Sequence, residues 1–225
     1  MENEDIQPQT KERIPFTGVR EDRDEKTGEL LQRIEMKNDL LDGLTELYNK
    51  NGRVSAKLSY KNSVLDGESL FYDDDGNLVQ SMEYIGGALD GVVKVYDKGL
   101  LASQSLFKYN KKNGLAITFS KTGLKMSEIE YVDGKMNGTM IAYDENENIV
   151  KIDEYKNDKV HGKSMLFYKS GEVMQAAIYV DGKIEGREIQ YYQDGSVKQI
   201  VHYENGLMLG DPVLFDPTGN VMKAA

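Results

Sequence analysis

The stretch Tyr131-Val132-Asp133-Gly134-Lys135-Met136-Asn137-Gly138 recurs along the chain and decides its fold. Residues 155–162, 179–186 and 203–210 repeat its pattern at intervals of 24 residues, and residues 84–91 precede it with the same ending. Self-similarity at a fixed period of this length is typical of a repeat protein, in which each unit packs only on its neighbours.

The last glycine of the pattern, called the repeat glycine below, marks the period. Repeat glycines stand at residues 43, 67, 91, 114, 138, 162, 186 and 210, and every step is 24 residues except the 23 between Gly91 and Gly114. An aromatic residue follows each by five positions, a second glycine follows most by nine, and a tyrosine follows most by seventeen. Three positions depart from this pattern: Gly99 comes one residue early, Glu147 replaces a second glycine, and Tyr109 comes one residue late.

Each repeat has the composition of two short strands joined by a turn. The run 139–143 is rich in β-formers, a polar segment follows, and the run 149–155 returns. We expect Asn51-Gly52, Asp75-Gly76 and Asp194-Gly195 at tight hairpin tips, because glycine and asparagine adopt positive φ at low cost. A residue missing near Lys111-Lys112-Asn113 and the absent glycine at Glu147 leave the local turn geometry open at both places.

Alternation along each strand predicts which side chains share a face. Ile141 and Tyr143 stand three and five residues after a repeat glycine, so they point to the same side. We expect the tyrosines at offset seventeen, such as Tyr60, Tyr84 and Tyr131, to pack on that side from the neighbouring strand. One hairpin buries too little surface to be stable alone. The sequence therefore predicts an all-β, elongated, single-layer array of about 8–9 antiparallel hairpins.

Two regions follow from this reading. Residues 1–15 are polar and acidic and are expected to form a flexible N-terminal tail. Residues 16–225 form the array, with units that start near residues 18, 43, 67, 91, 114, 138, 162, 186 and 210. The first unit is largely charged, and Pro212 and Pro217 stand in the last, which suits terminal strands that must not pair further. End-to-end self-association through the open ends stays an alternative.

The phrase Tyr-x-Asn/Asp-Gly-Lys-x-x-Gly, with an aromatic residue five positions on and a further glycine at nine, resembles the bacterial variant of the MORN repeat. Chains with many copies are similar to the YwqK family, whose members carry the label of toxin–antitoxin system antitoxins. The resemblance covers residues 16–225. It implies a scaffold and a protein-binding, antitoxin-like or immunity-like role, since the matching residues are turn glycines and core aromatics.

The composition of the chain limits the classes of partner that it is expected to bind. The net charge of −10 argues against nucleic acid and against anionic lipid, although lipid binding is a known property of MORN arrays, and it favours a basic protein partner. The chain has no cysteine, so no disulfide framework is expected. No apolar signal segment opens the chain, which favours the cytoplasm; a removed upstream segment would instead indicate the periplasm or cell surface.

The sequence offers no catalytic, metal or cofactor site. His161 precedes a repeat glycine where other repeats have Asp90, Asn137 or Glu185, so it is interpreted as a polar turn residue. Asp73-Asp74-Asp75 lacks the ligand spacing and the distal glutamate of a calcium loop and is interpreted as an acidic hairpin tip. The sequence thus predicts a protein that is not an enzyme.

The remaining candidates for function are residues on the surface. Phe71, Tyr168 and Tyr192 each add a ring beside the regular aromatic residue, and adjacent strand residues face opposite sides, so these rings are candidates for an exposed contact patch. Together with Asp73, Asp74 and Asp75 they form the predicted partner-binding set. The leading hypothesis is an acidic, tyrosine-bearing rod that occludes a basic protein partner. A structural or adhesive scaffold of the cell envelope is the alternative.

Overall fold

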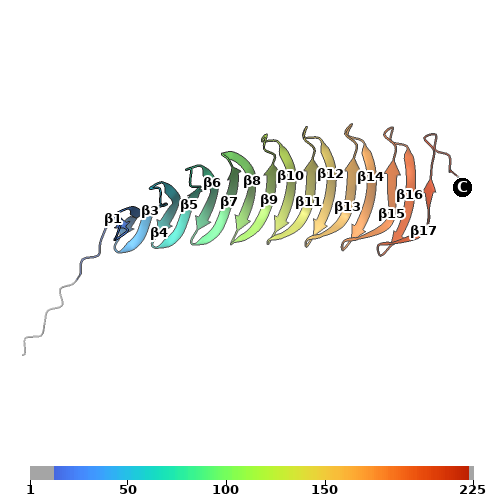
Figure 1. The fold of residues 1–225 in the computed structure, drawn as a ribbon. Helices are drawn as coiled ribbons and strands as arrows, with labels where there is room; N and C mark the ends of the chain where they lie inside the picture. Colours follow the sequence, from blue (N-terminus) through green and yellow to red (C-terminus); the bar gives the residue numbers. More distant parts are fainter. Residues whose placement is uncertain (1–12, 223–225) are drawn as a thin grey trace, which may run out of the picture.

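The computed structural model of the protein describes residues 13–222, and within this range it contains 17 β-strands and no helix. The predicted tail, residues 1–15, therefore lies outside the described residues except for its last three positions. The strands follow one another in chain order along one axis, so that β1 and β17 lie at opposite ends (Figure 1). This confirms the predicted all-β array of hairpins.

The strands alternate in direction and are of similar length. The odd-numbered strands are β1 Gly18–Arg23, β3 Leu40–Tyr48, β5 Val64–Tyr72, β7 Ala88–Asp97, β9 Lys111–Phe119, β11 Lys135–Tyr143, β13 Lys159–Phe167, β15 Lys183–Tyr191 and β17 Leu207–Leu214. The even-numbered strands are β2 Leu30–Lys37, β4 Val54–Lys61, β6 Leu78–Ile85, β8 Leu100–Lys108, β10 Lys125–Val132, β12 Ile149–Lys156, β14 Val173–Val180 and β16 Val197–Glu204. Each strand pairs antiparallel with its neighbours in sequence, which gives one open sheet.

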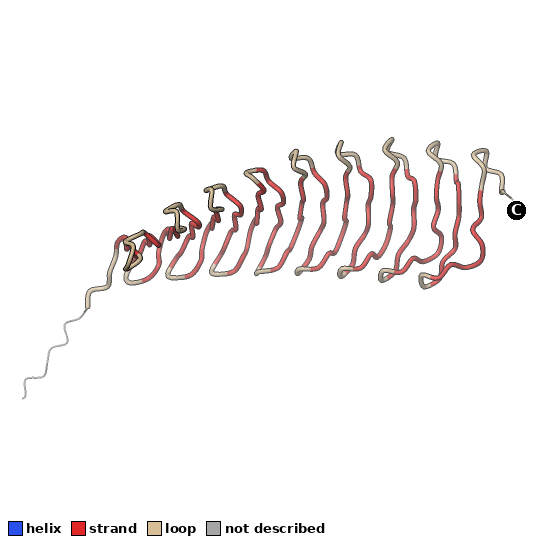
Figure 2. Tube along the Cα trace, in the orientation of Figure 1, coloured by secondary structure: helices blue, strands red, loops and turns tan. Residues whose placement is uncertain are grey.

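The two edges of the sheet differ in their turns (Figure 2). On one edge, two-residue connection turns such as Asn157-Asp158 have positive φ at both positions, 50° and 67°, which is the hairpin geometry that matches strand twist. On the other edge, five-residue tip loops such as 49–53 close through a bond from the Gly52 amide to the Asn49 carbonyl, 2.9 Å long. The prediction of tight turns at Asn51-Gly52, Asp75-Gly76 and Asp194-Gly195 was therefore wrong: these tips are five-residue loops in which the glycine alone takes positive φ.

The 23-residue step comes from a shortened tip. Strands β7 and β8 are joined by Lys98-Gly99 alone, and Gly91 pairs with Phe107 where Gly67 pairs with Tyr84. Phe107 thus takes the place of the second tyrosine, whereas Tyr109 is a turn residue that is 70% exposed. The expected position of the missing residue, near Lys111-Lys112-Asn113, was therefore wrong.

Glu147 keeps the tip geometry without a glycine. Its φ is 60°, and its amide bonds to the Asp144 carbonyl at 3.1 Å, as the tip glycines do. The Glu147 side chain also accepts a hydrogen bond from the Lys125 amide of the preceding tip, 3.0 Å away. The left-handed conformation is costly for a residue with a Cβ, so local strain is stored at this loop.

A bulge lies at each repeat glycine, a few residues after the connection turn. Between β12 and β13, for example, Tyr155 pairs with Val160 and Asp153 with Ser164, so Glu154 opposes the bulged residues around Gly162. Gly162 has a φ of 115°, which favours glycine. In four repeats a glutamate across the bulge accepts a hydrogen bond from the amide that follows the repeat glycine: Glu35 from Leu44, Glu83 from Val92, Glu130 from Thr139 and Glu154 from Lys163.

The sheet has a buried face and an opposite face. Paired residues share a face, and one row of pairs on the buried face runs through Ile34, Thr45, Leu58, Ser69, Met82, Val93, Ser105, Ala116, Ile129, Met140, Asp153, Ser164 and Ala177. Most buried residues of the described chain lie on this face, and small side chains fill its centre. Asp153 is fully buried there; its carboxylate accepts from Ser164 at 2.7 Å and lies 2.7 Å from the Lys151 ammonium.

The second tyrosine series lies on the buried face. Tyr84 and Met82 are two residues apart in a regular strand, and Met82 pairs with Ser69. Leu70 is adjacent to Ser69 and so points to the opposite face. The expectation that Tyr60, Tyr84 and Tyr131 pack on the face of the offset-three and offset-five residues was therefore wrong. A single bulge near each tip changes the alternation between the two strands of a hairpin.

Candidate interaction surface

The opposite face carries a row whose character changes along the rod. At its start Glu46 lies between Arg33 and Lys57, with N···O distances of 3.6 Å and 3.3 Å. From β11 onward the same row of paired residues is apolar. We call this part the apolar row; its members are Ile141, Ile152, Met165, Ala176, Ile189, Ile200 and Val213.

The aromatic series at offset five lies on the same face, toward the tips. Tyr143, Phe167 and Tyr191 stand two residues after members of the apolar row and are half-buried. Burial, together with the nearby Glu128 carboxylate, raises the pKa of Tyr143. These rings and the apolar row make a continuous apolar surface over β11–β16.

A shallow hollow of about 570 Å³ lies in this surface. Met165, Ala176 and Ile189 are among the residues that line it, and Lys163 and Arg187 border it with charge. Because residues 18–214 form one sheet, no second layer of the described chain covers the opposite face. An apolar surface of this kind, with charged residues at its border, is typical of protein interaction sites.

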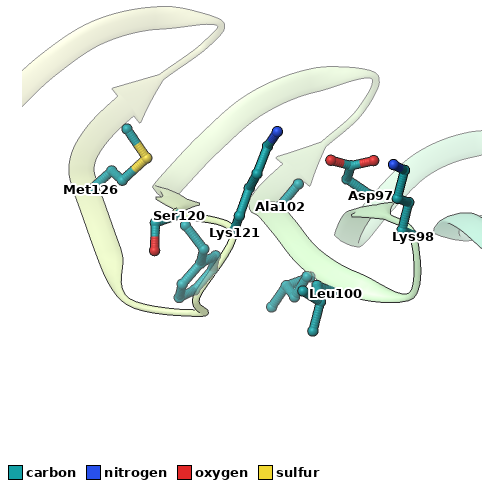
Figure 3. A pocket seen from close by; sticks show the side chains of 9 residues that line it. Asp97, Lys98, Leu100, Ala102, Ser120, Lys121 and Met126 are labelled. Atoms are coloured by element: carbon teal, nitrogen blue, oxygen red, sulfur yellow. The ribbon is translucent and has the colours of Figure 1, made fainter. Parts of the chain in front are cut away.

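A second hollow, called the tip notch below, lies where the row of tip loops is interrupted. Its volume is about 370 Å³. Lys98, Leu100 and Ala102 come from one hairpin, and Lys121 and Met126 come from the next (Figure 3). Elsewhere tip loops contact each other, as in the bond from Arg53 to the Asp74 carbonyl, 2.9 Å long. The two-residue turn at Lys98-Gly99 is too short to fill this space.

The predicted aromatic contact residues are half-buried rather than exposed. Phe71 lies on the buried face, where it pairs with Ala56 and Gln80. The Tyr168 hydroxyl donates to the Tyr191 carbonyl at 2.7 Å, and the Tyr192 hydroxyl donates to the Phe215 carbonyl at 2.9 Å. Both tyrosines thus tie one tip loop to the next repeat, and their role in partner binding stays a prediction.

The acidic residues of the predicted set belong to one tip loop. The Asp73 carboxylate accepts from the amides of Asn77 at 2.8 Å and Asp75 at 3.0 Å, and these contacts lower the pKa of Asp73, led by the Asn77 side-chain amide. Asp74 accepts from the Asn49 side chain at 3.3 Å. Asp73 therefore stabilises the loop, and Asp74 and Asp75 are exposed on its outside, where a partner could contact them.

The two histidines lie on different strands of the described part of the chain. His161 Nδ1 lies 3.3 Å from an Asp181 carboxylate oxygen, at a connection turn, and His202 is an exposed residue of β16. No cluster of three or more potential metal ligands occurs among residues 13–222. Within the same range there is no helix of the length and apolarity that a membrane span requires.

Sequence reasoning missed both hollows. Ile141 was expected on a face that the second tyrosines cover, and only the single layer shows that this face is uncovered. The early position of Gly99 was a sequence signal for the tip notch, because it indicates that the turn before β8 is one residue shorter.

This architecture defines a β-hairpin repeat scaffold. Four segments, residues 41–62, 65–85, 136–157 and 184–205, match the family model described as "MORN repeat variant". The chain therefore contains repeats of the MORN type. Each matched segment covers most of one hairpin, and the shortened hairpin β7–β8 is not among them.

No curated protein matches the chain. One similar solved structure is titled "Crystal Structure of TcdB2-TccC3-Cdc42"; the alignment covers 91% of this chain and 14% of that one, with 12% sequence identity and a TM-score of 0.22. The chain thus spans about one seventh of the length of that polypeptide.

Proposed function

We propose that the protein is a non-catalytic scaffold that holds a folded protein partner against the apolar row. MORN arrays are generally non-catalytic and mediate protein or membrane binding. The observation that carries the proposal is the uncovered apolar row on a single-layer sheet, which continues over β11–β16 beside three aromatic rings. The occupant is an apolar patch on a folded protein, which would exclude water from these side chains.

The proposed role is antitoxin-like or immunity-like: the rod would cover the functional surface of its partner. Residues 13–91 and 127–222 have net charges of −6 and −8, which favours basic surfaces on the partner where it faces these parts. Asp74 and Asp75 would contribute to that attraction from an exposed tip. We propose a cytoplasmic encounter with this partner, in keeping with the expectation from the sequence.

Affinity capture from the native cell, with matched variants as bait, tests the proposal. Ala176→Glu places a carboxylate in the apolar row, and Gln175→Glu places one a single residue away on the buried face. We expect one protein to be retained in stoichiometric amount by the wild type and by Gln175→Glu, and at least tenfold less of it by Ala176→Glu and by Ile189→Glu. Thermal unfolding of each bait checks that it is folded.

The captured protein is then purified and its binding measured by calorimetry, and cross-linking maps its footprint. Equal loss with Ala176→Glu and Gln175→Glu would contradict docking on the apolar row. Retention of no soluble protein, with the native chain in the envelope fraction, would favour an envelope scaffold instead.

A further inference from the structure

The middle of this acidic chain is basic. Between Val92 and Met126 it has one acidic residue, Asp97, and seven lysines, so the net charge of this part is +6 against −10 for the whole chain. The lysines are Lys94, Lys98, Lys108, Lys111, Lys112, Lys121 and Lys125. Because strands follow in chain order, these residues form a band across β7–β10 rather than a scattered set.

Five of the seven lysines of this basic band lie at the turns on the two edges of the sheet. Lys108, Lys111 and Lys112 lie at a connection turn, where Lys112 stands 4.9 Å from the centre of the Tyr131 ring. Lys98 and Lys121 lie at the tips, are exposed, and make no ion pair with any residue that the structure describes. These two ammonium groups are thus available to an external carboxylate.

The same two lysines flank the tip notch, and its floor is apolar. Asp97, next to Lys98 in the chain, also lines the notch (Figure 3). Leu100 and Met126 are each 52% exposed there, and the Phe119 side chain also lines the hollow. In each neighbouring hairpin the bulge residue near the tip is larger, Val79 or Met126, whereas in this hairpin it is Ala102. The short turn and the small side chain together leave room for a bulky side chain from outside.

We infer that the tip notch binds a short segment of a partner protein in which a bulky apolar side chain, Phe or Leu, lies between carboxylates. The apolar side chain would fill the hollow over Ala102, and the carboxylates would pair with Lys98 and Lys121. This inference rests on the proposed function and specifies the partner: it carries an acidic anchor segment between its basic surfaces.

The charge distribution favours such a segment over a nucleic acid or a lipid surface. Adjacent strands lie about 4.8 Å apart, so the band over four strands is roughly 15–20 Å wide. On both sides of it the rod is acidic, with net charges of −6 and −8. A long polyanion or a flat anionic membrane would meet these repulsive regions, whereas a segment of a few residues need not.

Fluorescence anisotropy with a synthetic probe tests the inference. The probe is a labelled octapeptide, Asp-Glu-Asp-Phe-Leu-Glu-Asp-Asp, titrated with the full chain at 50 mM salt. We expect Kd to rise at least tenfold for Lys121→Glu, which changes an exposed side chain, and for Ala102→Met, which fills the hollow. Replacing Phe-Leu in the probe by Ala-Ala should weaken binding at least tenfold.

The chain provides matched controls. Lys169 occupies in the tip loop 168–172 the place that Lys121 has in 120–124, and Val150 occupies the bulge position of Ala102 in another hairpin. Lys169→Glu and Val150→Met should leave Kd within twofold. Equal effects of Lys121→Glu and Lys169→Glu, or equal binding of the Ala-Ala probe, would overturn the inference.

Two further probes separate alternatives. They are a labelled oligo-dT of twenty nucleotides and vesicles with one third phosphatidylserine. If either binds more tightly than the peptide and loses binding with Lys121→Glu, the basic band is a nucleic-acid or membrane site, and the peptide site is overturned. The proposed function is tested separately, because Ala176→Glu lies in the apolar row and should not change peptide binding. If Ala176→Glu loses the captured protein and Lys121→Glu retains it, the inference about the tip notch is refuted and the proposed function stands.

Discussion

Glu154 and the backbone amide of Lys163 form a clamp over the bulge at Gly162. Glu154 Oε2 accepts the Lys163 N–H at 2.8 Å, and the same oxygen occupies the space that a Cβ on Gly162 would enter. In the next repeat Ile178 replaces the glutamate, and Gly186 has a φ of 76° instead of 115°. The glutamate and the glycine therefore act as a pair only in the four repeats that have the glutamate.

The clamp predicts coupling between these two positions. Glu154→Ala should destabilise the protein by about 1 kcal/mol, because the Lys163 N–H loses its acceptor. Gly162→Ala should cost roughly 2 kcal/mol, because alanine is strained at positive φ and its Cβ would collide with the Glu154 carboxylate. In the double variant the collision is gone, so the two effects should sum to less than their separate values. Urea unfolding of the four proteins measures this.

Gly186→Ala provides the control for this cycle. No atom lies within 4 Å of a Cβ built on Gly186, so only the strain at positive φ remains and the cost should be smaller than for Gly162→Ala. Strictly additive effects of Glu154→Ala and Gly162→Ala would show that the clamp does not couple the two positions.

Relief of strain at Glu147 should stabilise the protein. Glu147→Gly removes the Cβ from a residue with a φ of 60°, and we expect a gain of about 1 kcal/mol despite the lost contact with the Lys125 amide, which water can replace at an exposed site. Glu145→Gly is the control, since Glu145 lies in the same loop without positive φ and should not gain. A midpoint of thermal unfolding that falls for Glu147→Gly would show that the hydrogen bond outweighs the strain.

The sequence predicted the hairpins because their turns have specific chemistry. Asp133-Gly134 and its counterparts occupy connection turns with positive φ, and each period of 24 residues corresponds to one hairpin. The face of the second tyrosines was not predictable by counting. One bulge residue near each tip, such as Val79 between the pairs of Tyr72 and Phe71, changes the alternation, and its presence has no residue-type signature.

The candidate surfaces were harder to predict for a different reason. Ile152 and Met165 are apolar residues of the kind found in protein cores, and the sequence does not show that their face of the sheet is uncovered. The basic band was missed because the net charge of −10 was taken for the whole chain and not for the part from Val92 to Met126. The net charge alone therefore misdescribed the centre of the rod as acidic.

The tip loops should make stability depend on pH in acid. Hydrogen bonds from the Thr218 hydroxyl and the Asn220 amide lower the pKa of Asp216 from 3.8 to about 2. A carboxylate with a lowered folded-state pKa stabilises the fold above its unfolded pKa, and this contribution is lost as the pH falls through the folded value. We expect the thermal midpoint to be constant above pH 5 and to fall between pH 4 and pH 2.

Asp216→Asn should reduce the fall in the midpoint, because the residue no longer titrates. An NMR titration of the Asp216 carboxyl carbon gives its pKa directly. Asp211→Asn is the control, since the structure shows no hydrogen bond of the Asp211 side chain within the described range. An Asp216 pKa at or above 3.8 would contradict the role of these hydrogen bonds.

The buried Asp153 and its partner Ser164 should together be replaceable by a well-packed apolar pair at no cost in stability. Its carboxylate is fully buried, pairs with Lys151 and Ser164, and raises the pKa of Lys151 through their hydrogen bond. Asp153→Ala should cost about 2 kcal/mol, because it leaves a cavity and unpaired groups. Asp153→Leu with Ser164→Ala copies the apolar pair Ile129 and Ala116 of the same row and should match or exceed wild-type stability in urea unfolding. If the double variant is as unstable as Asp153→Ala, the polar triad is itself required for the correct pairing of β12 and β13.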